Sequence, residues 1–449
     1  MRINQLELQN FRLFADSRFS FPAPFTVLIG ENGRGKSALL HGLRVAAGAW
    51  LLGFRETERL HIEPEDIRRV DTPDNFSPQF PTLVRASGVV EGQQTDWARQ
   101  RNDFKGGMGR TGWAEAKPLI ELARQCDQAT NDNLQNVPLP VLVFFSTARL
   151  WVGAKREVAL KTKGSRIEDG YAQALTPDHR RKGPSSRTRA MGWIKRMYFQ
   201  ALEEGRWPDA GPSAGPGVRS GAAVLLKAVL EALATCLPGW TDLRWDSRTD
   251  DLSGLYQRPD GSAERVPLYY LSDGLRTMAG MVAEIAYRCA TLNGHLGKEA
   301  VRQSKGLVLI DELDMHLHPN WQRHVVRDLK TAFPNLQFVV TTHSPFIVQS
   351  LDSTELINLD FVSDAQPKDL RLEDVATEVM NVESEFGIEN EQQEALAAKY
   401  LDLLKPTIAG TMPDKLAQAS AAQLNALEDA VSDPGLRALL RLQRLRKTV

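Results

Sequence analysis

A glycine-rich segment near the N-terminus has the residue types and spacing of a phosphate-binding loop. It reads GENGRGKS over residues 30–37, fits the pattern G-x-x-x-x-G-K-[ST], and lies between an apolar run and a helix-like run. Its backbone amide groups and the following helix N-terminus would bind anions, with Lys36 bridging the β- and γ-phosphates and Ser37 holding Mg²⁺. The predicted nucleotide-binding positions are Gly30, Glu31, Asn32, Gly33, Arg34, Gly35, Lys36, Ser37 and Ala38.

A second candidate site follows another apolar run. The sequence GLVLIDE over residues 306–312 is typical of a buried strand that emerges into two carboxylates. We expect Asp311 to orient a magnesium-bound water and Glu312 to accept a proton from the attacking water, as phosphoryl transfer requires. Together with the glycine-rich loop, this pair predicts hydrolysis of ATP with Mg²⁺.

Two further segments carry residues suited to the same chemistry. Residues 271–277, LSDGLRT, place a serine and a glycine at a predicted helix N-terminus, and such an end binds anions. Residues 341–345, TTHSP, place His343 after an apolar run, where it can contact a γ-phosphate. The first segment resembles the signature motif of ABC ATPases, which implies that Ser272 and Gly274 contact the nucleotide held by a second copy. The order of the four motifs also matches that family.

These motifs require strands that end together and a helix that begins at the glycine-rich loop. The helix is predicted over residues 36–52 from its wide apolar stripe. Turns and short runs over residues 56–118 predict an antiparallel β lobe. Continuous apolar runs predict buried strands at residues 25–29, 138–145, 306–310 and 336–341. The predicted fold class is α/β, an ABC-type P-loop NTPase head with an antiparallel β lobe, a helical insertion and a helical C-terminal tail.

Composition and motif positions divide the chain into four parts. Residues 1–148 and 266–365 would form the two halves of the ATPase head, separated by a basic and helical insertion at residues 149–265. Residues 366–449 are rich in Ala, Leu, Glu and Gln and predict a helical tail, which is our candidate for partner docking. No internal repeat is evident.

The insertion contains the one basic segment of the chain. Residues 149–196 hold 13 Lys or Arg residues against four acids. Such a run could bind the DNA backbone, although most charge runs are solvated faces, so contact with double-stranded DNA stays open. The candidate DNA-contacting residues are Lys155, Arg156, Lys161, Lys163, Arg180, Arg181 and Lys182.

The overall composition is that of a soluble globular protein. The 449 residues carry a net charge of -1, so a nucleic-acid footprint could only be local. The scattered cysteines, Cys126, Cys236 and Cys289, predict reduced thiols. The N-terminus lacks a secretion signal, and the longest apolar stretch is about half of the roughly 20 residues that a membrane span needs. We therefore expect a cytoplasmic protein with no membrane partner.

The chain resembles the SMC and RecF-like branch of ABC ATPases through LELQNFRLF, GENGRGKS and DELDMHLHPNWQ. That resemblance implies that Arg12 approaches the phosphates and that Asp314 contacts a second copy across a homodimer formed around ATP, which could assemble further. More narrowly, FFSTARLW, LSDGLRTMAGMVAEIAYR, NGHLGKEA and LHPNWQRHVVRDLKTAFPNLQFVVTTHSP resemble the Septu-type anti-phage ATPases, the PtuA-like group. This second resemblance implies a DNA-linked defence role with an HNH-type nuclease partner.

Two departures from the family pattern stand out. ABC ATPases place a glutamine after the strand that precedes the insertion, whereas this chain continues into Ser146, Thr147 and Arg149. The long coiled coil of SMC proteins is also missing, because residues 150–270 lack sustained heptads. His316 and His318 near Glu312 could suggest a metal site, but the family resemblance assigns this segment to dimer contacts.

Three other functions compete with a defence ATPase. A RecF-like repair ATPase would share every motif and differ in its partners. A nuclease of the overcoming-lysogenization-defect type would need a C-terminal TOPRIM domain, yet only about 100 residues follow His343 and they lack a strand-borne D-x-D. An ATP-dependent clamp that barely hydrolyses is also compatible with the altered glutamine position.

Overall fold

The computed structural model describes most of the head and little of the tail. The described residues are 1–55, 57–72, 75–103, 111–131, 137–150, 165–177, 180, 186–204, 221–258, 260–361, 366–381, 396, 399–400, 423–428 and 430. The chain divides into two compact units, Met1–Val375 and Ala376–Val449. The sequence predicts a tail from residue 366, which is about ten residues before the second unit begins.

A five-stranded parallel sheet forms the centre of the first unit. Its strands run in the order β14-β3-β13-β12-β8, and every neighbouring pair is parallel. The strands are β3 (Phe25–Ile29), β8 (Val141–Phe145), β12 (Gly306–Ile310), β13 (Leu336–Thr341) and β14 (Leu356–Asn358). All residues of β3, β8, β12 and β13 are buried, as expected for a parallel sheet covered on both faces. The four strands predicted from apolar runs are confirmed, and their carboxyl ends lie at one edge of the sheet.

A second sheet is antiparallel and forms the predicted β lobe. Its order is β2-β1-β6-β7, and β4 and β5 form a separate two-stranded ribbon. The strands are β1 (Arg2–Phe11), β2 (Phe14–Ser20), β4 (Arg69–Thr72), β5 (Asn75–Pro78), β6 (Thr82–Val90) and β7 (Gln93–Arg101). In β1, Ile3, Leu6 and Leu8 are buried and face the core. The N-terminal strand therefore joins residues 82–101 in this lobe.

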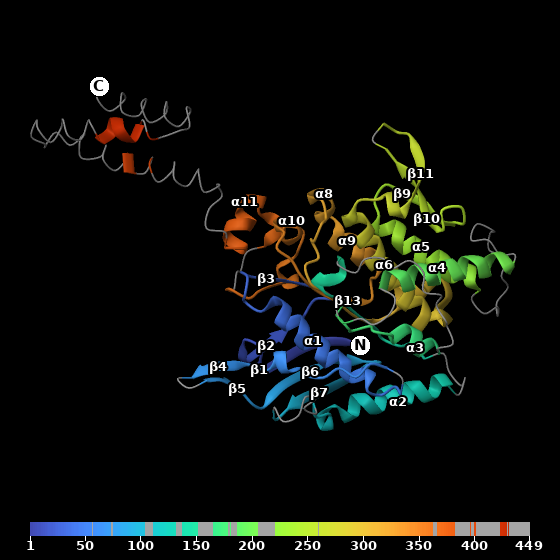
Figure 1. The fold of residues 1–449 in the computed structure, drawn as a ribbon, viewed down its shortest axis with the longest axis horizontal. Helices are drawn as coiled ribbons and strands as arrows, with labels where there is room; N and C mark the ends of the chain where they lie inside the picture. The colour runs from blue at the N-terminus through green and yellow to red at the C-terminus, as the bar shows by residue number, and fades with distance from the viewer. Residues whose placement is uncertain are drawn as a thin grey trace, which may run out of the picture. The chain divides into compact units, whose positions relative to one another are not determined.

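Helix α1 (Lys36–Leu51) lies between the two sheets (Figure 1). It contacts β1, β6 and β7 on one side and β12 and β13 on the other, so it is buried almost all round. Small residues allow this close packing, because a Cβ added to Gly42 would lie 2.8 Å from the Leu8 side chain. The indole of Trp97 in β7 donates to the Ala46 carbonyl at 2.9 Å and joins the lobe to the helix. Helix α2 (Lys117–Asn131) packs against α1 and β7.

A group of helices packs around α6 (Asp273–Leu292), which begins at the signature-like segment. Its other members are α3 (Arg166–Tyr171), α4 (Ser186–Glu203) and α5 (Ala222–Cys236). Arg288 of α6 is fully buried, pairs with Glu284 at 2.7 Å and donates to the Gly170 carbonyl at 2.6 Å. Breaking such a buried pair is strongly destabilising, so these contacts fix α6 in the head. The remaining short helices are α7 (Ala300–Gln303), α8 (Pro319–Gln322), α9 (Val325–Ala332), α10 (Pro345–Val348) and α11 (Leu372–Asp374).

The insertion is not purely helical, which corrects the prediction for residues 149–265. It contains a three-stranded antiparallel sheet made of β9 (Trp240–Asp246), β10 (Asp251–Gln257) and β11 (Ala263–Pro267). Strand β9 buries Trp240, Leu243 and Trp245, and its burial alternation is interrupted at Asp242, which has a φ of 46°. Residue 266, the predicted boundary, falls inside β11.

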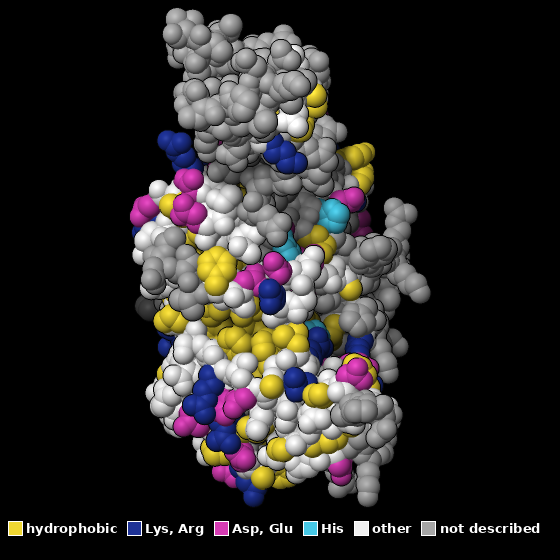
Figure 2. All heavy atoms as spheres, turned by 90° about the vertical axis from the view of Figure 1, so that its left-hand side faces the viewer, with side chains coloured by type: hydrophobic (Ala, Val, Ile, Leu, Met, Phe, Trp, Pro, Cys, Tyr) yellow, Lys and Arg dark blue, Asp and Glu magenta, His cyan; other side chains and the backbone are white. Residues whose placement is uncertain are grey.

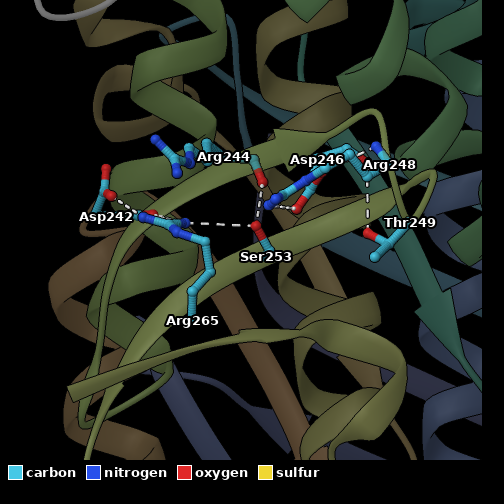
Figure 3. Close-up of polar contacts among 7 residues, drawn as sticks. All are labelled: Asp242, Arg244, Asp246, Arg248, Thr249, Ser253 and Arg265. Atoms are coloured by element: carbon cyan, nitrogen blue, oxygen red, sulfur yellow. Dashed lines mark hydrogen bonds and ion pairs between the residues drawn. The ribbon is translucent and has the colours of Figure 1, made fainter. Parts of the chain in front are cut away.

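Polar contacts join the three strands of this small sheet (Figure 3). The guanidinium of Arg265 in β11 reaches Asp242 in β9 and lies 3.4 Å from the Ser253 hydroxyl in β10. Arg248 pairs with Asp246 at 2.8 Å within one turn. Because arginines and carboxylates alternate there, this sheet does not present a face of one charge.

The predicted basic segment falls mostly outside the described residues. Of its candidate DNA-contacting residues, only Arg180 is described, and Lys155, Arg156, Lys161, Lys163, Arg181 and Lys182 are not.

On the face shown in Figure 2, the coloured hydrophobic side chains form a band bordered by both acidic and basic ones. Among the residues that the structure describes, no helix combines the length and apolar character needed to cross a bilayer.

The second unit is described only in short helical pieces. Tyr400 and Glu428 are both buried, and the tyrosine hydroxyl donates to the glutamate carboxylate at 2.6 Å. This bond joins segments 28 residues apart, so the described parts of the tail pack on each other. Residues 423–428 are helical, as predicted.

Candidate active site

The motif residues meet where the parallel strands end. The glycine-rich loop follows β3, Asp311 and Glu312 follow β12, and Thr342 and His343 follow β13. Ligands of open α/β sheets bind at this edge, beyond the carboxyl ends of the strands. The fold thus brings these three motifs to one edge of the sheet.

The glycine-rich loop has the backbone conformations that its glycines permit. Gly33 and Gly35 adopt φ angles of 88° and 101°, in the left-handed region that other residues rarely occupy. A Cβ on Gly35 would also lie 2.7 Å from the Phe14 ring, so a side chain at this position would collide with the turn between β1 and β2. Glu31, Asn32, Gly33 and Arg34 are exposed at the surface of the loop. Ala38 is buried in the first turn of α1.

Lys36 lies inside the loop. Its Nζ donates to the Gly30 carbonyl at 2.5 Å and to the Glu31 carbonyl at 3.0 Å. Burial lowers the pKa of Lys36, and nearby carboxylates, with Asp360 the strongest, act in the opposite direction. An ammonium group held in this way is suited to binding phosphate oxygens.

The candidate magnesium ligands are adjacent. The Ser37 hydroxyl lies 3.2 Å from Asp311 Oδ1, which joins the start of α1 to the end of β12. A hydroxyl and a carboxylate are hard oxygen donors of the kind that Mg²⁺ binds together with substrate phosphates. Ser37 and Asp311 therefore fit the predicted metal site.

Thr341 organises the two carboxylates and was not singled out in the sequence. Its buried hydroxyl donates to Asp311 Oδ1 at 2.7 Å and accepts from the Glu312 amide at 2.7 Å. Glu312 has a φ of 53°, an uncommon angle for a residue other than glycine, and this bond fixes its backbone. The sequence offers only a threonine at the end of an apolar run, two residues before His343, and nothing local indicates a bond to a residue 30 positions away.

Replacing Thr341 by Val should impair catalysis more than nucleotide binding. Valine keeps the shape but leaves the half-buried Glu312 amide without its acceptor, at a cost of about 1–3 kcal/mol. We expect ATP turnover to fall by about tenfold, with the Kd for ATP changed less than threefold. Thr331→Val on the exposed face of α9 is the control, and unchanged turnover in Thr341→Val would mean that Thr341 does not position these carboxylates.

Asp314 holds the His343 segment within the same chain. Its Oδ1 accepts from the Thr342 hydroxyl at 2.5 Å and from the His343 amide at 3.2 Å. The His343 side chain itself is exposed at the sheet edge, where a phosphate contact is sterically open. The family resemblance implied that Asp314 contacts a second copy, and its carboxylate is here engaged internally.

The signature-like segment lies beside the loop that follows Glu312. A Cβ on Gly274 would lie 2.0 Å from the His316 carbonyl, so only glycine fits there. Ser272 is the exposed N-cap residue of α6, and its hydroxyl makes no capping bond. Among the described contacts, no hydrogen bond joins Ser272 or Gly274 to residues 30–38. His318 caps α8 by accepting from the Asn320 amide at 3.2 Å.

Arg12 is held by an acidic partner, Asp66. It lies in the turn between β1 and β2, its Nε pairs with Asp66 Oδ1 at 2.8 Å, and its amide donates to the Asp66 carbonyl at 2.7 Å. The side chain lines a cavity of about 160 Å³ with Arg44, Glu63 and Arg180 among its other walls. Arg12 would have to leave Asp66, or share it, to bind a phosphate as predicted.

The position of the missing glutamine is adjacent to the carboxylates. β8 ends at Phe145, whose carbonyl accepts from the Asp311 amide at 2.9 Å. Ser146 follows and is buried, and a short 3-10 helix (Thr147–Leu150) continues the chain. Ser146 therefore directly follows the strand residue that bonds to the Asp311 backbone.

Two family models match the two halves of the head. One, described as "AAA domain", matches residues 5–112, and the other, described as "AAA domain, putative AbiEii toxin, Type IV TA system", matches residues 164–349. Each half contains part of the site, because the first includes the glycine-rich loop and the second includes Ser272, Glu312 and His343.

Similar proteins come from bacterial retron and Septu systems. The chain is 35% identical over 131 residues to the "Retron Ec83 probable ATPase" of Escherichia coli, which is 29% of this chain and 23% of that protein. It is 41% identical over 100 residues to the "Septu protein PtuA" of Bacillus thuringiensis, 21% of this chain and 24% of that protein. The matches thus span about a quarter of the length of these relatives.

A solved structure, the "SMC head domain from Thermotoga maritima", is 15% identical, covers 82% of this chain and 97% of its own, and has a TM-score of 0.38. The two AAA-domain matches, together with the mixed parallel and antiparallel sheets, give the chain an AAA/ABC-type P-loop ATPase fold.

Proposed function

We propose that this chain binds and hydrolyses ATP as the ATPase subunit of a prokaryotic anti-phage defence system. The observation that carries the proposal is the convergence of Ser37, Asp311 and Thr341 through bonds of 2.7 and 3.2 Å, next to the buried ammonium of Lys36. These contacts join three motifs that are far apart in the sequence. A structural role alone does not require a lysine, a serine and two carboxylates at one sheet edge.

Each residue has a defined role in the proposed reaction. Lys36 and the loop amides neutralise the phosphates, and Ser37 and Asp311 would hold the magnesium ion, which supplies charge neutralisation when bound. Glu312 accepts the proton of the attacking water, and His343 contacts the γ-phosphate. Asn32 completes the phosphate contacts from the loop, and Arg12 does so after leaving or sharing Asp66.

The proposed active unit is a homodimer around ATP. Ser272 is exposed, its hydroxyl makes no capping bond, and it has no bond to its own glycine-rich loop. A helix N-terminus of this kind is suited to a phosphate supplied by another copy. A head-to-tail pair of copies would then contain two sites, each made from the loop of one protomer and the signature of its partner.

Mixing two inactive variants tests this shared site. Lys36→Ala disables the loop of a protomer and Ser272→Arg disables its signature, so neither variant alone should turn over ATP. In a mixed dimer, one of the two sites combines an intact loop with an intact signature. Equal mixing should restore at most about a quarter of wild-type turnover, because half of the dimers are mixed and each has one intact site. If the mixture shows only the sum of the near-zero activities of the two variants, Ser272 acts on the loop of its own protomer.

The defence role rests on the similarity to retron and Septu proteins and has a direct test. We propose that the ATP-bound dimer controls an HNH-type nuclease partner or DNA, with the tail from about residue 366 as the docking segment. Cells carrying the gene with its neighbouring genes should resist phage, and Glu312→Gln should abolish resistance. A RecF-like repair ATPase is the alternative, and sensitivity to DNA damage in place of phage resistance would favour it.

A further inference from the structure

Asp360 lies directly beside the glycine-rich loop although it is more than 320 residues away in the sequence. Strand β14 pairs in parallel with β3, and the pairing ends at Asn358 and Ile29. The Leu359 amide then donates to the Ile29 carbonyl at 3.0 Å, so the chain continues along the start of the loop. The Asp360 side chain is only 6% exposed.

The carboxylate of Asp360 binds the loop at two points. Its Oδ2 accepts from the Glu31 amide at 2.7 Å, and Arg34 Nε lies 2.9 Å from its Oδ1. Close packing leaves little room between the two segments, because a Cβ on Gly30 would lie 3.3 Å from Oδ2. A charged acceptor bound to a backbone amide forms one of the stronger protein hydrogen bonds.

The same peptide unit also contacts Lys36. The peptide bond between Gly30 and Glu31 has its carbonyl bonded to Lys36 Nζ at 2.5 Å, while its N–H donates to Asp360. Because a peptide unit is planar, a bond at its N–H also fixes the direction of its carbonyl. Asp360 thereby sets the position of one of the two carbonyls that hold the Lys36 ammonium.

We infer that Asp360 is a positioning residue for ATP binding, which acts by orienting the Gly30–Glu31 peptide and through it Lys36. The inference rests on the proposed function, since it deepens the description of the same ATP site. The charge of Asp360 does not oppose the nucleotide directly, because Arg34 neutralises it and the peptide lies between it and Lys36. Sequence patterns around β14 give no hint of this role.

The test is the Kd for ATP with Mg²⁺ in the full chain. Asp360→Ala removes the acceptor and should raise the Kd on the order of tenfold, whereas Asp360→Asn keeps a carbonyl oxygen for the Glu31 amide and should raise it less than about threefold. Asp352→Ala, at an exposed pair with Lys368, is the matched control and should bind ATP as the wild type does. Thermal unfolding without nucleotide verifies that each variant is folded.

The outcomes separate this inference from the proposed function. A wild-type chain that does not bind ATP overturns the proposed function itself. If the wild type binds ATP and Asp360→Ala binds it with the same Kd, only the proposed role of Asp360 is overturned. An Asp360→Asn variant that binds ATP as weakly as Asp360→Ala contradicts the route through the Glu31 amide. If Asp360→Ala does not fold, Asp360→Ser, which is too short to reach that amide, replaces it with the same expected loss.

Discussion

Glu312→Gln should abolish ATP turnover while leaving ATP binding intact. A general base contributes about 10² to 10⁴ in rate, and glutamine has nearly the same shape but cannot accept the proton of the attacking water. The substitution should not disturb the backbone, because the Glu312 amide remains bonded to the Thr341 hydroxyl at 2.7 Å. Single-turnover kinetics and the Kd for ATP, measured on the same protein, would separate the chemical step from binding.

The same variant reports on the proposed dimer. If two copies close around ATP and separate after hydrolysis, blocking hydrolysis should accumulate a nucleotide-bound dimer, visible as a doubled mass in solution. Glu121→Gln on the exposed surface of α2 is the matched control and should behave as wild type. Full turnover in Glu312→Gln would assign the base to another residue. A wild type that binds but never hydrolyses ATP would support the clamp function.

Lys36→Ala should remove ATP binding almost completely. The Lys36 residue is 8% exposed, and its ammonium is held by the Gly30 and Glu31 carbonyls, so no other cation of the loop can take its place without rearrangement. Charged hydrogen bonds to two phosphates contribute about 1.5–3 kcal/mol each, which predicts a rise in the Kd on the order of a hundredfold or more. Titration with a fluorescent ATP analogue would measure it.

The control for this prediction is Lys298→Ala, an exposed lysine outside the site. Lys36→Ala should unfold at nearly the wild-type temperature, since the loop surface around it is exposed and a buried charge is removed. Retention of ATP affinity within threefold in a folded Lys36→Ala variant would contradict the assignment of residues 30–37 as the phosphate site.

Local sequence patterns were sufficient for the frame of the head. Continuous apolar runs predicted β3, β8, β12 and β13, because a strand buried on both faces has no polar side to interrupt the run. The glycine-rich loop, Asp311 and Glu312 were predictable since each follows directly on such a strand. The three strands β9, β10 and β11 were missed. They are short and separated by turns, and they lie in residues 149–265, which were predicted as a basic and helical insertion.

The contacts that orient the site residues could not be read in the same way. Thr341 bonds Asp311 across 30 residues, Arg12 bonds Asp66 across 54, and Asp360 reaches Glu31 across 329. None of these separations produces a periodic signal, because periodicity reports only on which face of a local element is buried.

The sequence by itself determined which residue types are available for phosphate, metal and proton chemistry, and on which strands and helices they lie. Only the tertiary structure decided which of them touch. The order β14-β3-β13-β12-β8 places the end of β14 beside the glycine-rich loop and the end of β13 beside Asp311. Strand order arises from the packing of the whole head, and for that reason the positioning roles of Thr341 and Asp360 emerge only from the folded chain.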